Sequence, residues 1–224
     1  MHTITEILKQ IEDYVKEKLQ DDTSGHDWFH IERVRKLAIT ISEKEQANRF
    51  ICEAAALLHD VIDDKIVDDE EQAVIGVEEL LNELGVAKSD CIHIIEIITT
   101  MSFKGGSQHG MSTIEGKVVQ DADRIDALGA IGIARTFMYA GAKGHPMHDP
   151  KIPPRLKTMS KEEYRNGKST AMNHFYEKLL KLKSRINTET ALQIAEERHT
   201  VIEQFVEDFL EEWQGDGSNE KLTH

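Results

Sequence analysis

Histidine and aspartate residues fall at inward-facing positions of predicted helices in three separate parts of the chain. His30 begins the apolar stripe of one predicted helix, and His59 lies on the stripe of the next, with Asp60 beside it. Asp123 lies four residues from an apolar residue on either side, in a later helix. Buried ionisable groups need partners, and two neutral imidazoles with two carboxylates suit a divalent cation that keeps positions open for water. We therefore predict that His30, His59, Asp60 and Asp123 are metal ligands.

Each of these residues also has an ordinary structural explanation. An inward-facing histidine is more often a hydrogen-bonded core residue than a ligand, and an aspartate in a helix more often faces solvent. Asp121 and Asp126 are rivals of Asp123, because the run DADRID places three carboxylates at different helical angles. Of these, Asp126 is expected to orient a ligand or to cap a neighbouring element.

Two further carboxylates follow the pair formed by His59 and Asp60. If the helix continues, Asp63 and Asp64 lie one turn beyond that pair. A carboxylate at that place could accept a proton from water or hold the water in line with a phosphorus atom. The alternative is an acidic loop over residues 63–70 that caps the next helix.

Several cationic or polar side chains near these carboxylates could neutralise phosphate oxygens. Arg33 lies about one turn after the first histidine, Arg124 directly follows the last aspartate, and Lys104 is in a glycine-rich run. His26 could bond a phosphate or simply cap a helix. We predict that these four residues bind substrate, with a surface salt bridge as the plainer alternative for the charged ones.

The elements that must hold these residues are predicted to be helices. Long segments repeat apolar residues at three-to-four spacing, and the four prolines all fall between residues 146 and 154. The predicted helices start near residues 4 and 27, and others cover 49–62, 70–84, 89–101, 112–139, 164–182 and 188–213. Residues 103–110 are predicted to form a loop. The pattern is typical of one all-α domain over residues 1–213, with residues 214–224 as a disordered tail.

Composition limits the class of protein further. The chain has 224 residues, of which 39% are hydrophobic and 30% charged, and its formal net charge is -14. This charge disfavours binding to nucleic acid duplexes and to anionic membranes. No disulfide framework is expected from Cys52 and Cys91, and the charged N-terminus lacks the apolar run of a secretory leader. We therefore expect a soluble cytoplasmic protein.

The spacing H-x28-HD-x62-D, from His30 to Asp123, resembles the signature of the HD-domain metal-dependent phosphohydrolase superfamily. The runs GHDWFHIERV, LLHDVIDDK, DADRIDALGAIGIAR and NTETALQIAEERH are similar to those of small bacterial HD hydrolases of the YpgQ/YedJ type. This resemblance implies a compact helical HD bundle with a metal site at its centre, and it selects Asp123 as the fourth ligand. By similarity to alarmone-hydrolysing HD enzymes, Asp63 and Asp64 are the catalytic candidates.

The function that the resemblance implies is hydrolysis of a small phosphorylated nucleotide, with (deoxy)nucleoside triphosphates cleaved to monophosphate and pyrophosphate. We expect Mn2+ because oxygen and imidazole ligands mix in an open site; Mg2+, Fe2+, Ni2+ and Zn2+ are the other candidates. The alternatives are a nucleotide monophosphatase, a phosphodiesterase, and a nucleotide sensor without catalysis. A two-iron oxygenase would need His93 or His109 at the metal.

Overall fold

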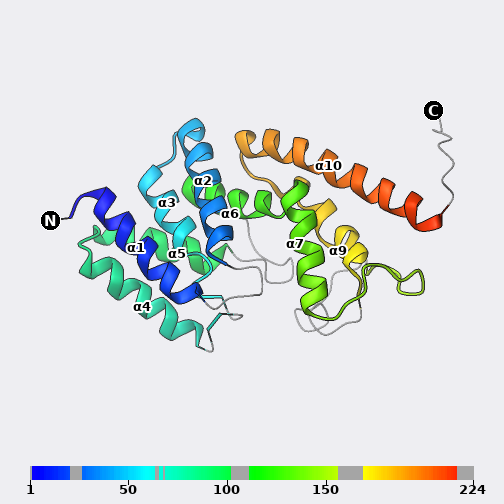
Figure 1. Cartoon of the computed structure of the whole chain (residues 1–224). Coiled ribbons are helices and arrows are strands. Elements are labelled where there is room, and N and C mark those ends of the chain that lie inside the picture. The colour runs from blue at the N-terminus through cyan, green and yellow to red at the C-terminus, as the bar shows by residue number, and fades with distance from the viewer. Residues whose placement is uncertain are drawn as a thin grey trace.

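Helices form the regular structure of the chain in the computed structural model, which describes residues 2–20, 27–63, 66–67, 69–101, 111–155 and 169–215. The α-helices are α1 (Ile4–Leu19), α2 (Trp28–Glu45), α3 (Arg49–Leu58), α4 (Glu70–Glu83), α5 (Lys88–Thr100), α6 (Ile114–Asp126), α7 (Gly129–Ala142), α9 (Ala171–Glu177) and α10 (Glu189–Gln214). Two short 3-10 turns, η1 (Leu179–Lys181) and η2 (Lys183–Arg185), follow α9. The all-α prediction is confirmed (Figure 1).

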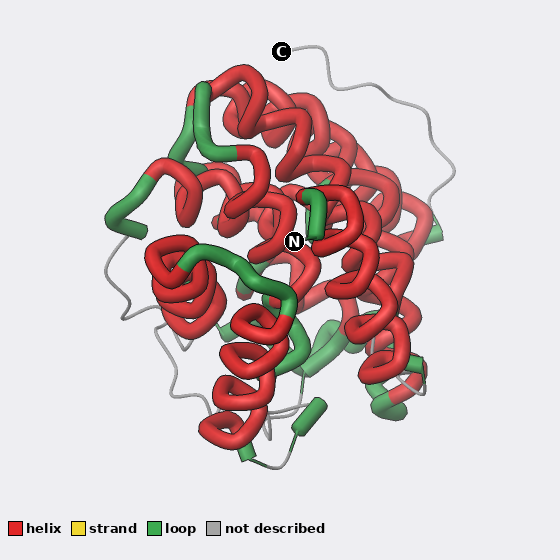
Figure 2. The backbone as a smooth tube through the Cα atoms, turned by 90° about the vertical axis from the view of Figure 1, so that its left-hand side faces the viewer, coloured by secondary structure: helices red, strands yellow, loops and turns green. Residues whose placement is uncertain are grey.

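The centre of the molecule is formed by α2, α3 and α6, which pack against one another. Helices α1, α4 and α5 lie on one side of this centre, and α7, α9 and α10 lie on the other (Figure 1). Viewed from the α1 side, the described part of the chain consists of helices joined by loops (Figure 2). One continuous apolar core runs through these helices, so the central helices are covered on both sides and their inward-facing polar groups are buried.

Local capping signals set where several helices begin. At the start of α1, the Thr3 hydroxyl accepts a hydrogen bond from the Glu6 amide at 3.2 Å, and the Glu6 carboxylate accepts one from the Thr3 amide at 2.7 Å. This reciprocal pair is a capping box, which the pattern Thr-x-x-Glu favours at a helix start. The Asp27 carboxylate caps α2 by accepting from the His30 amide at 2.8 Å. The first turn of α2 is therefore anchored beside His30.

The third helix is shorter than predicted. It ends at Leu58, and the next residues form turns in which the amides of Val61 and Asp63 donate to the carbonyls of Leu58 and Asp60, at 3.2 and 3.0 Å. These bonds span three residues, as in a 3-10 turn, rather than the four of an α-helix. The predicted helix over residues 49–62 therefore ends four residues early, so Asp63 does not lie on a continued α-helix beyond His59 and Asp60. Asp64 lies outside the described residues.

The predicted helix over residues 112–139 is two helices, α6 and α7, joined at a corner. Gly129 has φ +69, a conformation that glycine adopts without steric cost. A Cβ atom at Gly132 would collide with the Ala127 carbonyl. Gly129 and Gly132 therefore allow the chain to turn sharply after α6.

The predicted helix over residues 164–182 is also broken. In the described residues, α9 ends at Glu177, and Lys178 leaves the helical region with φ -133 and ψ -60 before the 3-10 turns begin. Residues 102–110 and 216–224 lie outside the described part of the chain. The predicted loop, the disordered tail and the domain boundary at residue 213 therefore stay predictions.

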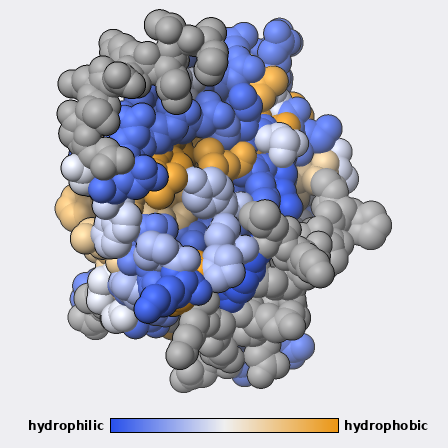
Figure 3. Space-filling view, turned by 90° about the vertical axis from the view of Figure 1, so that its right-hand side faces the viewer, coloured by the Kyte–Doolittle hydropathy of each residue, from blue (hydrophilic) through white to orange (hydrophobic). Residues whose placement is uncertain are grey.

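The surface on the α10 side is mostly hydrophilic, with a smaller apolar patch near its middle (Figure 3). Exposed apolar side chains on the elements of this side include Met138, Met147 and Trp213. Among the helices of the described ranges, none is both long enough and apolar enough to cross a membrane.

Candidate metal centre

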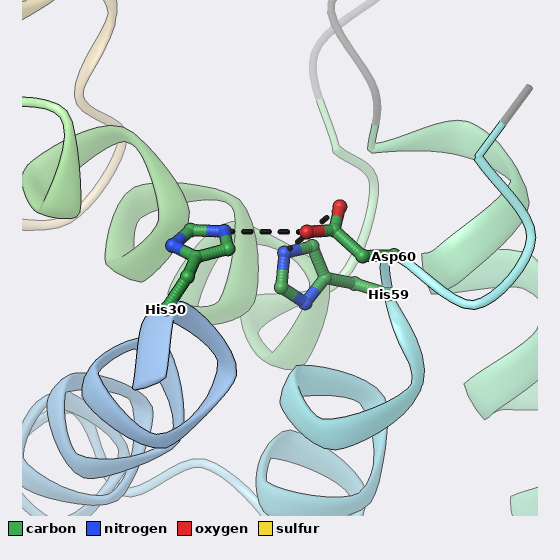
Figure 4. A group of neighbouring side chains, drawn as sticks. All are labelled: His30, His59 and Asp60. Atoms are coloured by element: carbon green, nitrogen blue, oxygen red, sulfur yellow. Dashed lines mark ion pairs between the residues drawn. The ribbon is translucent and has the colours of Figure 1, made fainter. Parts of the chain in front are cut away.

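His30, His59 and Asp60 converge at the centre of the helical bundle (Figure 4). The carboxylate of Asp60 lies between the two rings, with Oδ2 3.3 Å from His30 Nε2 and Oδ1 3.3 Å from His59 Nε2. One potential ligand atom from each of the three residues lies within 4.8 Å of the others. The exposed fractions are 1% for His30 and 6% for each of the other two residues. Three of the four predicted ligands thus form one buried cluster.

Asp123 approaches the same cluster from α6. Its Oδ1 atom lies 3.6 Å from His30 Nε2 and 3.9 Å from His59 Nε2. Its side chain is 41% exposed, so this carboxylate lies on the solvent side of the buried group. The structure therefore brings together all four residues that the sequence predicts as ligands. Their binding of a metal stays a prediction.

Hydrogen bonds at the far side of each ring fix which nitrogen faces the cluster. His59 Nδ1 lies 2.8 Å from the Ala56 carbonyl, which only accepts, so Nδ1 carries the hydrogen. His30 Nδ1 lies 2.8 Å from Asp126 Oδ2 and donates in the same way. Each Nε2 atom can therefore present a lone pair to the cluster when its ring is neutral, the form in which histidine binds metals.

The donor set fits a divalent cation. His59 Nε2 is buried and has no hydrogen-bond partner within the described part of the chain, which is costly for a polar atom. When the His59 ring is neutral, the lone pair of Nε2 would otherwise face the oxygens of Asp60 and Asp123. A cation that accepts both nitrogen and oxygen ligands removes this conflict. The orphaned nitrogen is thus explained by a metal site.

Without a metal, the neighbouring carboxylates favour the protonated form of His30. Burial disfavours the charged form of His30, but hydrogen bonds with Asp126 and Asp60 outweigh it and raise the pKa of His30 to about 9. Burial also opposes ionisation of Asp126, yet hydrogen bonds from His30 and Arg33 hold the pKa of this carboxyl well below its usual range. Asp126 is therefore an anion next to the candidate ligand.

Asp126 is the centre of a hydrogen-bonded group that the sequence predicts only in part. Its carboxylate accepts from His30 Nδ1, from Arg33 Nε and Nη2 at 2.6 and 3.0 Å, and from Arg135 Nη1. The expected role, orientation of a ligand, agrees with the bond to His30. Arg135 was not predicted, and its only signal is that it ends the run DADRIDALGAIGIAR.

The two described arginines that were predicted to bind phosphate also bond protein groups. Arg33 donates two hydrogen bonds to Asp126. Arg124 Nη1 donates to the Arg185 carbonyl in η2 and lies 3.8 Å from Asp121 Oδ1. Both side chains therefore have structural partners, but the carboxylates involved are buried, so neither contact is the surface salt bridge of the alternative interpretation. His26 and Lys104 lie outside the described residues.

The three carboxylates of the run DADRID have three different surroundings. Asp121 accepts hydrogen bonds from the amides of Asn187 and Thr188, at 2.8 to 3.0 Å, and so anchors the start of α10. Asp123 faces the cluster, and Asp126 bonds His30. The structure thus separates the rivals by their partners.

The acidic residues that follow Asp60 have different structural roles. The carboxylate of Asp69 caps α4 by accepting from the Gln72 amide at 3.0 Å. Asp63 is partly buried in the turn after the cluster, and its carbonyl accepts from the Ile66 amide at 2.8 Å. Asp69 therefore serves as the cap that the alternative interpretation expected.

His93 lies apart from the cluster. Its Nε2 atom lies 2.9 Å from the Thr113 hydroxyl and 3.8 Å from Glu115 Oε2. Within the described residues, His93 does not belong to the group formed by His30, His59 and Asp60, and His109 lies outside them. The two-iron alternative therefore loses one of its two candidate ligands.

Comparison with known proteins agrees with this geometry. The HD domain family model matches residues 28–128, a range that contains His30, His59, Asp60 and Asp123. The uncharacterized protein YpgQ of Bacillus subtilis (strain 168) is 46% identical over 200 residues, which cover 88% of this chain and 89% of YpgQ.

Two solved structures extend the likeness to three dimensions. An HD-superfamily hydrolase from Bacillus thuringiensis has 50% identity and a TM-score of 0.76, with 95% of this chain and 99% of that one covered. The crystal structure of Bacillus subtilis YpgQ in complex with ADP has 43% identity and a TM-score of 0.74, with 92% and 97% covered. Members of this superfamily bind divalent metals, and the chain presents the histidine and aspartate cluster for one. The chain therefore belongs to the HD-domain family of metal-dependent hydrolases.

Proposed function

We propose that the protein is a metal-dependent phosphohydrolase that cleaves (deoxy)nucleoside triphosphates to monophosphate and pyrophosphate. The observation that carries the proposal is the convergence of His30 Nε2 and His59 Nε2 on the carboxylates of Asp60 and Asp123. The complex of the relative YpgQ with ADP supports a nucleotide as the substrate.

The four converging residues are the proposed ligands, and Mn2+ is the proposed ion because the donors are mixed nitrogen and oxygen. When bound, a divalent cation supplies Lewis acidity toward a phosphoryl oxygen and toward an attacking water. The partly exposed side chain of Asp123 supports an approach of substrate and water from this side of the cluster. The buried side, formed by His30 and Asp60, excludes solvent.

Asp63 is the proposed proton acceptor, with Asp64 as its neighbour in the chain. The amide of Asp63 donates to the Asp60 carbonyl at 3.0 Å, so the turn ties the Asp63 backbone to that of a proposed ligand. A carboxylate that reaches the attacking water from this turn could take its proton. This supports Asp63 as the general base.

Arg33, Arg124, Lys104 and His26 are the proposed contacts to the phosphates. The side chain of Arg33 is 32% exposed, and its two bonds to Asp126 use Nε and Nη2. Nη1 is therefore the atom that we propose for a phosphate oxygen. A guanidinium at this place would offset the charge that grows on the phosphoryl group.

The test is a product assay with the purified protein, Mn2+ and a panel of nucleoside triphosphates, monophosphates and cyclic diesters. We expect pyrophosphate and monophosphate in equal amounts, and an Asp60→Ala variant that loses this activity. Inorganic phosphate alone would identify a monophosphatase, and a linearised diester would identify a phosphodiesterase. No phosphorus product above the Asp60→Ala level would contradict the hydrolase proposal altogether.

A further inference from the structure

We infer that Asp126 is a positioning residue that fixes the tautomer and the ring orientation of His30, and that Arg33 and Arg135 hold Asp126 in place for this task. The inference rests on the proposed role of His30 as a ligand. It deepens that proposal because it assigns the centre a second layer of residues, drawn from α2, α6 and α7.

The geometry around Asp126 leaves its carboxylate little freedom. The side chain is 1% exposed. Oδ1 accepts from Arg33 Nε at 2.6 Å, whereas Oδ2 accepts from His30 Nδ1 at 2.8 Å, from Arg33 Nη2 at 3.0 Å and from Arg135 Nη1. Donors from two guanidinium groups and one imidazole therefore hold both oxygens.

The chemistry of these partners decides where the hydrogen of His30 resides. A guanidinium has only donors, so Arg33 and Arg135 keep Asp126 an acceptor toward every neighbour. An ionised acceptor next to Nδ1 requires that Nδ1 carry a hydrogen. Nε2 of the neutral ring then bears the lone pair and points toward Asp60, at 3.3 Å.

Arg135 links this arrangement to α7, beyond the corner at Gly129. Its Nη1 atom lies 3.0 Å from His30 Nδ1, and because both nitrogens carry hydrogen, Asp126 is the acceptor that they share. His59 differs, since its Nδ1 is fixed by the Ala56 carbonyl only three residues away. The orientation of His30 thus depends on tertiary structure, whereas that of His59 depends on a local turn.

The test compares Asp126→Asn with Asp121→Asn as a matched control. Both aspartates are fully buried on α6, and both accept several hydrogen bonds, but the partners of Asp121 are Asn187 and Thr188. Mn2+ binding is measured from the electron paramagnetic resonance signal of the free ion. We expect Asp126→Asn to weaken Mn2+ binding by about 10- to 100-fold, and Asp121→Asn to leave it unchanged while lowering thermal stability.

A second readout reports the tautomer itself. Protein with 15N-labelled histidine is loaded with Zn2+, a diamagnetic probe, and long-range 1H–15N spectra are recorded. In the wild-type protein we expect His30 Nδ1 to show the shift of a protonated nitrogen. In Asp126→Asn we expect this signal to move or divide, because an amide NH2 group must face either Arg33 or the shared site of His30 and Arg135.

The outcomes separate this inference from the proposed function. If wild-type protein binds no Mn2+, the metal centre is overturned and this inference with it. If wild-type protein binds Mn2+ and Asp126→Asn binds it equally with unchanged His30 signals, only the inference is overturned. Should Asp126→Asn fold poorly, Arg135→Gln serves in its place, with a several-fold loss of affinity expected and unchanged affinity contradicting the inference.

Discussion

The imidazole rings of His30 and His59 meet edge to face, with centroids 5.3 Å apart and planes at 70°. One ring comes from the first turn of α2, and the other from the residue that directly follows α3. Because α2 and α3 pack against each other in the core, their packing sets the separation of the two nitrogens. The two rings thus form the buried wall of the candidate metal centre.

Removal of His59 should abolish the stabilisation that Mn2+ confers. At 100 times its dissociation constant a ligand adds about 2.7 kcal/mol to the free energy of unfolding, or about 5 to 10 °C in Tm for a chain of this size. We expect this shift for the wild-type protein and none for His59→Ala. The measurement is thermal unfolding with and without Mn2+.

His199→Ala is the matched control for that experiment. His199 is also buried and has a ring nitrogen without a hydrogen-bond partner in the described residues, but it lies on α10. This variant should keep the full Mn2+ shift. Loss of the shift in both variants would show that the effect reflects general destabilisation and not the metal centre.

Metal binding should release a proton from His30. Because the pKa of His30 in the metal-free protein is raised to about 9, the ring must lose the Nε2 proton before that atom can bind a cation. We expect apparent Mn2+ affinity to fall by up to about tenfold per unit as the pH is lowered below 9. Calorimetry at pH 7.5 in two buffers of different ionisation enthalpy should give about one proton per ion.

The raised pKa of His30 also predicts how the stability of the metal-free protein depends on pH. A group whose pKa is raised from 6.5 to about 9 on folding stabilises the metal-free protein fully below pH 6.5, and this contribution is lost as the pH rises through 9. Metal-free protein should therefore lose stability over that window relative to Mn2+-loaded protein. Equal pH profiles for the two forms would contradict the assignment of the proton to His30.

Asp63→Asn should impair turnover without impairing metal binding. Loss of a general base typically costs about 10²- to 10⁴-fold in rate, so we expect kcat to fall by that factor while the dissociation constant for Mn2+ changes little. Asp69→Ala is the control, because Asp69 caps α4 and its loss should cost about 1 kcal/mol of stability with kcat retained. Equal activity of Asp63→Asn and the wild-type protein would remove Asp63 from the mechanism.

The corner between α6 and α7 should be intolerant of a single methyl group. Gly132→Ala would push Cβ into the Ala127 carbonyl, whereas a Cβ at Gly141 in the same helix would meet nothing within 4 Å. We expect Gly132→Ala to lower the free energy of unfolding by more than about 2 kcal/mol, and Gly141→Ala to raise it by about 0.4 to 1 kcal/mol. Chemical denaturation of both variants measures this difference.

The beginnings of helices could be predicted from the sequence because their signals are satisfied within one turn. Thr3 and Glu6 form a capping box, and Asp27 caps the helix that carries His30. The end of α3 at Leu58 and the corner at Gly129 were missed. Those breaks depend on how the chain meets neighbouring helices, which apolar periodicity does not report.

The candidate centre shows the same contrast between what local sequence signals predict and what tertiary contacts decide. Residue types and inward positions suggested His30, His59, Asp60 and Asp123, because polar groups on the core faces of packed helices must find partners among themselves. The resemblance to the HD superfamily then selected Asp123 over its rivals in the run DADRID. Only the tertiary structure decided what each carboxylate of DADRID contacts and brought Arg135 to Asp126. These contacts join residues from separate helices, so the directions of their side chains are set by the packing of the whole bundle.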